Sequence, residues 1–236
     1  FFDKALEGFT MFALNQGEVC TCPSRAVIQE SIYDQFMERA LERVKAVTQG
    51  SPLEASTMIG AQASSEQMEK ILSYIKLGQE EGAELLTGGN RTMLEGEHAD
   101  GYYIEPTVFK GNNKMRIFQE EIFGPVLSVV RVKTFEDAVK LINDHEYGNG
   151  VSIYTRDGDA GRTFANKIQV GMVGINVPIP VPMAFHSFGG WKRSLFGDSA
   201  MHGMEGIKFY TKLKTVTSRW PSGIRSNAEF VMPTMK

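Results

Sequence analysis

The chain has 236 residues, of which 42% are hydrophobic and 22% charged, with a formal net charge of -3 at pH 7. A chain of this length can bury a core of its own, and its weakly acidic balance offers no electrostatic footprint for nucleic acid or an anionic membrane surface. No apolar run is long enough to span a bilayer. We therefore expect neither a nucleic-acid partner nor a membrane partner.

Helical and strand-like patterns alternate along the chain. The first helix has apolar residues at Phe2, Leu6, Phe9 and Ala13 and is expected to stop at residues 15–17. Further helices are predicted at residues 31–47, 64–82, 134–144 and 161–170, and strands at residues 25–29, 83–89, 102–109, 126–132, 150–155, 172–177 and 213–220. Thr134 and Asp137, three residues apart at the start of the helix at 134–144, can form a capping box. Such alternation is typical of an α/β fold, a mainly parallel open sheet flanked by helices.

The chain has two cysteines, Cys20 and Cys22, in the stretch NQGEVCTCPSR at residues 15–25. They lie too close together to close a useful disulfide loop, which favours a reduced compartment such as the cytoplasm. A zinc site would need about four ligands at finger-like spacings. We predict no metal site, because the histidines are scattered and none lies near the cysteines: His98, His145, His186 and His202.

Two interpretations of the cysteines stay open from the residues alone. Free cysteines are most often small buried hydrophobic residues. However, Gly17 allows a sharp turn just before Cys20. A thiol on such a loop could attack a carbonyl carbon while backbone N–H groups stabilise the oxyanion that forms.

Three motifs resemble signatures of the aldehyde dehydrogenase superfamily. They are NQGEVCTCPSR at residues 15–25, QEEIFGPVLSVV at 119–130 and FGGWKRS at 188–194, and they occur in family order. The resemblance implies an enzyme that oxidises a small-molecule aldehyde with NAD or NADP, and possibly with coenzyme A as co-substrate. Cys20 matches the nucleophile, whose thiohemiacetal loses a hydride to the nicotinamide and becomes a thioester.

The resemblance also implies roles for residues that bind the cofactor. Glu121 matches a carboxylate that accepts the hydroxyls of the nicotinamide ribose, and Phe123 a ring beside the nicotinamide. Gln67 and Lys70 match positions that border the ribose. The ordinary alternatives are an exposed loop glutamate, a core phenylalanine and solvated polar residues on a helix.

Phe185 and Phe188 are expected beside the aldehyde pocket, close to the third motif. Residues 1–213 would form the catalytic domain and residues 214–236 a tail that assembles a homodimer or homotetramer. The family's N-terminal dinucleotide-binding domain is absent from these residues, and the opening pattern has no methionine and no N-cap, as though cut from something longer.

The two halves of the chain resemble different members of the family. Residues before about the second motif resemble bacterial acetaldehyde-type dehydrogenases, and those after it resemble methylmalonate-semialdehyde dehydrogenases, which acylate coenzyme A. This difference suggests a chimeric gene. Three functions therefore stay open: a hydrolytic aldehyde dehydrogenase seen as a fragment, a CoA-acylating semialdehyde dehydrogenase, or an inactive scaffold that only assembles.

Overall fold

The computed structural model describes residues 2–220. Strand β4 (Val126–Val132) is the centre of its main sheet, parallel both to β1 (Arg25–Gln29) and to β3 (Thr107–Lys110). β2 (Glu84–Thr87) runs antiparallel to β3, so the strand order is β1-β4-β3-β2. The predicted class, a mainly parallel open sheet in an α/β fold, is confirmed.

Alternate residues of the central strands face opposite sides of the sheet, and helices cover both sides. On one side, Leu127 and Val129 pack with α1 (Phe2–Leu14) and α2 (Tyr33–Lys45). On the other side, Val126 and Val130 pack with α3 (Ser65–Glu80) and the short α4 (Arg116–Gln119). β4 can therefore be apolar along nearly its whole length, and only Arg131 of its residues is exposed.

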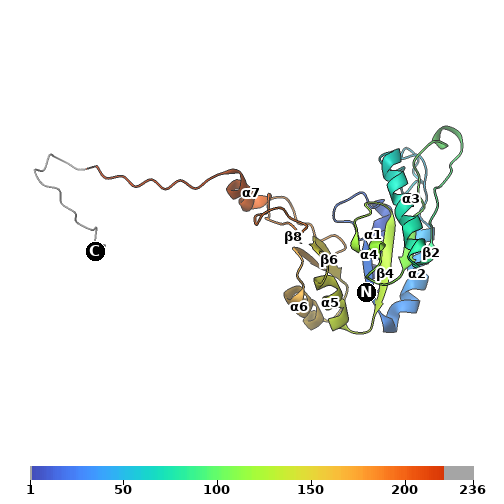
Figure 1. Ribbon diagram of the computed structural model, residues 1–236, viewed down its shortest axis with the longest axis horizontal. Helices are drawn as coiled ribbons and strands as arrows, with labels where there is room; N and C mark the ends of the chain where they lie inside the picture. The colour runs from blue at the N-terminus through green and yellow to red at the C-terminus, as the bar shows by residue number, and fades with distance from the viewer. Residues whose placement is uncertain (1, 221–236) are drawn as a thin grey trace, which may run out of the picture.

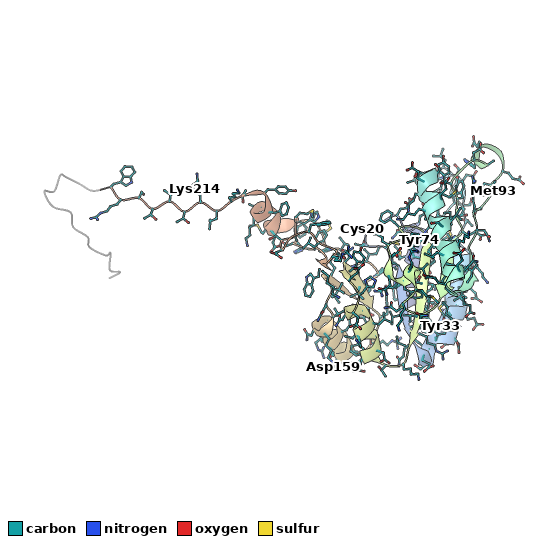
Figure 2. The ribbon with its side chains drawn as sticks, in the orientation of Figure 1. Cys20, Tyr33, Tyr74, Met93, Asp159 and Lys214 are labelled. Carbon is teal, nitrogen blue, oxygen red and sulfur yellow. The ribbon has the colours of Figure 1, made fainter. Side chains whose placement is uncertain are left out.

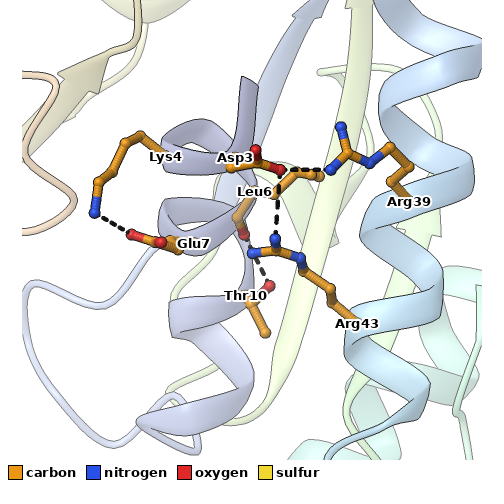
Figure 3. Close-up of polar contacts among 7 residues, drawn as sticks. All are labelled: Asp3, Lys4, Leu6, Glu7, Thr10, Arg39 and Arg43. Atoms are coloured by element: carbon orange, nitrogen blue, oxygen red, sulfur yellow. Dashed lines mark hydrogen bonds and ion pairs between the residues drawn. The ribbon is translucent and has the colours of Figure 1, made fainter. Parts of the chain in front are cut away.

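An ionic contact on the surface joins the first two helices (Figure 3). Asp3 of α1 pairs with Arg39 and, at 3.5 Å, with Arg43, both on α2. Beneath this contact, the rings of Phe9 and Phe12 are buried between the helices and the sheet. The buried rings contribute more to the packing of α1 than the exposed ion pairs do, because exposed pairs contribute little.

A smaller lobe follows β4. It contains α5 (Phe135–Asn143), α6 (Gly158–Lys167), the parallel pair β6 (Gly150–Ile153) and β7 (Met172–Ile175), and the antiparallel pair β5 (Tyr147–Gly148) and β8 (Trp191–Lys192). Figure 1 shows α5, α6 and β6 grouped apart from the main sheet. Thr134 and Asp137 form a reciprocal capping box at the start of α5, with N···O distances of 3.0 and 3.1 Å, as their spacing predicted. A core of its own, around Val139 and Phe164, makes this lobe a second packing unit.

The C-terminal part of the described chain leaves the lobe through α7 (Gly203–Tyr210) and continues as an extended segment that projects from the molecule (Figure 1). The strand predicted at residues 213–220 is wrong for this chain: residues 211–220 are exposed and form no strand. Alternating Thr and Val favour an extended backbone, but a strand also needs a partner edge, and none in the described part of the chain reaches this segment. Residues 221–236 of the predicted tail lie outside the described residues.

Candidate active site

A left-handed turn after α1 begins the cysteine loop. Gln16 has φ 55° and Gly17 φ 66°, and the Gly17 N–H donates to the Phe12 carbonyl at 3.0 Å. A Cβ atom at Gly17 would lie 1.8 Å from the carbonyl oxygen of Gly124. Gly17 is therefore required both for its backbone conformation and because the loop that contains Gly124 passes directly against it.

The two cysteines differ in environment. Cys20 is exposed, whereas Cys22 is half-buried beside the core under α1, with its Sγ 3.9 Å from the Phe12 carbonyl oxygen. Burial raises the pKa of the Cys22 thiol to about 11. Because the thiolate is the nucleophilic form, Cys22 is chemically inert near neutral pH. Within residues 2–220 the backbone N–H of Cys20 has no hydrogen-bond partner, so it is free to donate to a ligand.

Side chains on both flanks of the glycine turn fix the loop. The Gln16 amide donates to the Ala61 carbonyl at 2.8 Å, and a carboxylate oxygen of Glu18 accepts from the Ala63 N–H at 2.9 Å. Both partners belong to the segment that leads into α3. The cysteine loop is therefore attached to the helix that carries Gln67.

A cleft of about 1880 Å³ lies between the main sheet and the smaller lobe, and Cys20 is at their junction (Figure 2). Of the residues to which the sequence analysis gave a catalytic, cofactor or substrate role, four line this cleft: Cys20, Glu121, Phe123 and Phe188; Cys22 lines it too. Residues from the first, second and third motifs thus meet around one space. The cleft is larger than a typical small-molecule site, and its walls are mainly apolar with a few polar groups.

The Phe123 loop presents its ring to the cleft in an unusual backbone conformation. Phe123 has φ 57° and is 36% exposed. The Gln67 side-chain amide donates to the Phe123 carbonyl and, at 3.5 Å, to the Ile122 carbonyl. Gln67 therefore acts from behind the loop as a support and is not on the cleft wall.

The neighbouring glutamates have different roles. Glu120 is held by Arg116, with an Nε···Oε1 distance of 2.7 Å, and accepts from the Tyr74 hydroxyl at 2.7 Å. The Arg116 guanidinium, followed by the Tyr74 hydroxyl, lowers the pKa of Glu120. Glu121 is exposed and lines the cleft. Both glutamates line the cleft, and Glu121 is the more exposed of the two.

Two residues predicted from the sequence lie away from this arrangement. Lys70 is exposed on α3, three residues after Gln67, and is not among the residues that line the cleft. Phe185 is 70% exposed and packs on His186, with ring centroids 4.5 Å apart. Phe188, in contrast, stacks on His202 with ring centroids 4.4 Å apart, and both rings line the cleft.

Asn149, which no sequence motif singled out, lies against the cysteine loop in the structure. Its side-chain amide donates to the carbonyl oxygen of Cys20 at 2.8 Å. The partners are 129 positions apart, so no local pattern reveals the contact. The Tyr-Gly-Asn-Gly stretch at residues 147–150 was the only local signal available, since an Asn-Gly pair indicates a turn.

The described part of the chain contains no group of three or more His, Cys, Asp or Glu side chains arranged to hold a metal ion. Its helices include none that is long and apolar enough to cross a bilayer.

Comparisons with known proteins agree with one another. The model of the aldehyde dehydrogenase family matches residues 2–216. An acetaldehyde dehydrogenase 2 from Cupriavidus necator is 63% identical over 197 residues, which cover 84% of this chain and 39% of that protein. The chain therefore spans about two fifths of the length of such relatives.

Solved structures give the same result. A methylmalonate-semialdehyde dehydrogenase from Oceanimonas doudoroffii is 42% identical, with a TM-score of 0.87 over 94% of this chain and 46% of that one. A betaine aldehyde dehydrogenase from Staphylococcus aureus, in complex with NAD⁺, is 34% identical, with a TM-score of 0.82 over 89% of this chain and 41% of that one. The fold is thus that of the matched family.

Proposed function

The chain belongs to the aldehyde dehydrogenase family, and on this premise we propose that it contributes the nucleophile and part of the cofactor site for the oxidation of a small aldehyde. The observation that carries the proposal is the exposed Cys20 thiol, with an unpartnered backbone N–H, in one cleft with Glu121 and Phe123.

The first step forms a bond between Cys20 and the substrate. The Cys20 thiolate attacks the aldehyde carbon, a C–S bond forms, and the carbonyl π electrons move to oxygen. The Cys20 N–H donates to this oxyanion, and a single donor of this kind contributes about 3–4 kcal/mol to the transition state of comparable reactions. Collapse of the oxyanion would then expel hydride from the same carbon to an acceptor bound in the cleft and leave a thioester on Cys20.

A nicotinamide dinucleotide, when bound, supplies the hydride acceptor. The residues of the cleft fit such a group: Glu121 presents a carboxylate that can accept two ribose hydroxyls, and the Phe123 ring is 36% exposed beside it. Gln67 holds the Phe123 loop in place. Lys70 is exposed on α3 and could contact a ribose only from there. We therefore propose a smaller role for Lys70 than for Gln67.

The fate of the thioester separates two versions of the proposal. Water would release an acid, as in an acetaldehyde-type enzyme, and a coenzyme A thiol would release an acyl-CoA, as in a methylmalonate-semialdehyde dehydrogenase. The relatives found by sequence include an acetaldehyde dehydrogenase, and the fold neighbours include a methylmalonate-semialdehyde dehydrogenase. We propose the hydrolytic reaction, and we attribute the mixed resemblance to a chimeric origin with its junction near residues 119–130.

We further propose that residues 1–213 are the catalytic part and residues 214–236 an assembly tail. Apolar side chains at the end of the described chain support at least a dimer, because Leu213 is 97% exposed and Trp220 91%. The proposed location is the cytoplasm, where an exposed thiol stays reduced. Light scattering at micromolar concentration tests the assembly, and a monomer would contradict it.

Alkylation with iodoacetamide, followed by peptide mapping, tests the nucleophile. We expect Cys20 to be modified well before Cys22 at pH 7.5, and Cys20→Ala to remove the fast phase. The same samples are assayed for NADH with aldehyde and NAD, with and without coenzyme A. Because the chain spans about two fifths of the length of its relatives, we expect little turnover by this chain alone. Preferential labelling of Cys22 would refute the proposal.

A further inference from the structure

Asn149 connects the smaller lobe to the cysteine loop. It lies between β5 and β6, and its side-chain amide donates to the Cys20 carbonyl at 2.8 Å. The acceptor is the peptide oxygen of the proposed nucleophile itself. Asn149 thus acts on the backbone of Cys20 and leaves the thiol and the N–H of that residue uncommitted.

The backbone around Asn149 is fixed on both sides. The Asn149 carbonyl accepts from the Met172 N–H at 3.1 Å, where β7 begins, and the Gly148 N–H donates to the Ser194 hydroxyl at 3.1 Å. Ser194 ends the third motif. The backbone of Asn149 is therefore held by the fold of the lobe, so its side chain extends toward the cysteine loop from a fixed position.

Gly190, in the same motif, gives the Asn149 side chain its space. A Cβ atom at Gly190 would lie 3.1 Å from the Asn149 Oδ1 and 2.7 Å from the Ser194 Cβ. A residue larger than glycine would press on the amide and on the side chain that supports its neighbour. The third motif thus leaves the space that the Asn149 side chain occupies.

We propose that Asn149 is a positioning residue for Cys20. By holding the carbonyl of Cys20, its amide fixes the rotation of the peptide that follows the nucleophile, and with it the direction of the Cα–Cβ bond. This inference rests on the proposed function of Cys20. It assigns to the smaller lobe a direct part in presenting the nucleophile, in addition to lining the cleft.

Three substitutions separate donation from space filling. Asn149→Asp keeps the shape but replaces the donor by a carboxylate oxygen that repels the Cys20 carbonyl. Asn149→Leu removes the donor at similar volume, and Asn149→Gln retains an amide on a longer side chain. Asn90→Leu is the matched control, because the Asn90 amide donates to the Glu105 carboxylate at 3.0 Å and Asn90 is not among the residues that line the cleft.

Two measurements on the whole chain are made for each variant. The first is the rate of alkylation of Cys20 by iodoacetamide, and the second is hydrogen–deuterium exchange of the peptide that contains residues 15–25. We expect alkylation about threefold slower and exchange severalfold faster in Asn149→Asp and Asn149→Leu, at least partial rescue in Asn149→Gln, and wild-type values in Asn90→Leu. Thermal unfolding of each variant shows that it is folded, and if the Leu variant fails to fold, the Asp and Gln variants decide.

The outcomes are distinguishable. If Asn149→Asp has wild-type values in both measurements, the side chain only fills space and the inference is overturned. The inference also fails if Asn149→Gln is as slow as Asn149→Leu, because an amide donor then has no value at this site. If the wild-type chain is alkylated at Cys22 and not at Cys20, the proposed function fails first.

Discussion

Apolar side chains differ in burial between two regions of the molecule. They form a buried core in the N-terminal body, residues 2–132, and are exposed in the C-terminal segment, residues 195–220. In the body, Phe12, Phe109 and Leu127 are each 0% exposed. In the C-terminal segment the only buried residue is Gly206, and Phe196 is 95% exposed. Apolar character alone therefore does not bury a residue; a sheet face or another helix must be present to cover it. These exposed apolar side chains are the basis of the proposed assembly.

The largest expected effect compares one phenylalanine from each region. Phe109→Ala leaves a cavity between β3 and the helices α3 and α4, and we expect the free energy of unfolding to fall by about 3–5 kcal/mol. Phe196→Ala, the matched control, is expected to change it by less than about 0.5 kcal/mol. Urea unfolding of both variants measures the difference. Equal losses of stability in the two variants would contradict the difference in burial between the two regions.

Two glycines with left-handed backbones give the next largest effect. Gly17→Ala adds a clash with the Gly124 carbonyl to the cost of a positive φ, and we expect a loss of about 2–4 kcal/mol. Gly197 has φ 84°, and nothing lies within 4 Å of an added Cβ. We therefore expect Gly197→Ala to lower the free energy of unfolding by about 1 kcal/mol, through the positive φ alone. Thermal unfolding of both variants separates the clash from the strain. A Gly17→Ala loss no larger than that of Gly197→Ala would show that the two loops do not meet.

Burial in the body also predicts a pH dependence. The pKa of Cys22 rises in the folded chain from 9.0 to about 11, so the unfolded chain releases this proton first as the pH rises. The contribution of the neutral, buried Cys22 thiol to the free energy of unfolding is fully present below about pH 9. It is lost between pH 9 and pH 11, and the free energy of unfolding falls by about 2–3 kcal/mol. We expect Cys22→Ala to lack this alkaline loss and Cys20→Ala to retain it, as measured by urea unfolding at several pH values. The same loss in both variants would contradict the burial of Cys22.

The smallest expected effect is that of a partly exposed ionic contact in the body. The pKa of Glu120 is lowered by Arg116, so its stabilising contribution is present above the unfolded value near 4.3 and is lost as the pH falls below it. Because both side chains are partly exposed, we expect Glu120→Gln to cost only a few tenths of a kcal/mol at pH 7 and less at pH 3. Glu54→Gln, at an exposed position, is the control. A loss that persists at pH 3 would point to packing instead of charge.

Local signals in the sequence predicted most of the fold. The capping box at Thr134 and Asp137 and the apolar run of β4 are complete within a few residues, and both are present in the structure. The strand expected at residues 213–220 failed because pairing depends on a second edge, which local propensity cannot supply.

The site was predictable only where its residues belong to continuous motifs. Cys20, Glu121 and Phe188 meet in the cleft. The support of the Phe123 carbonyl by Gln67 and of the Cys20 carbonyl by Asn149 could not be foreseen, because a side chain can reach the backbone of any element that the fold brings near.

The close approach of Gly17 to Gly124 makes two motifs one mechanical unit. Neither backbone can shift toward the other, since no side chain separates them. A ligand that pushes the Phe123 loop toward the glycine turn therefore also pushes the turn before Cys20. A small fluorophore attached to Cys20 would report such a movement of the second motif.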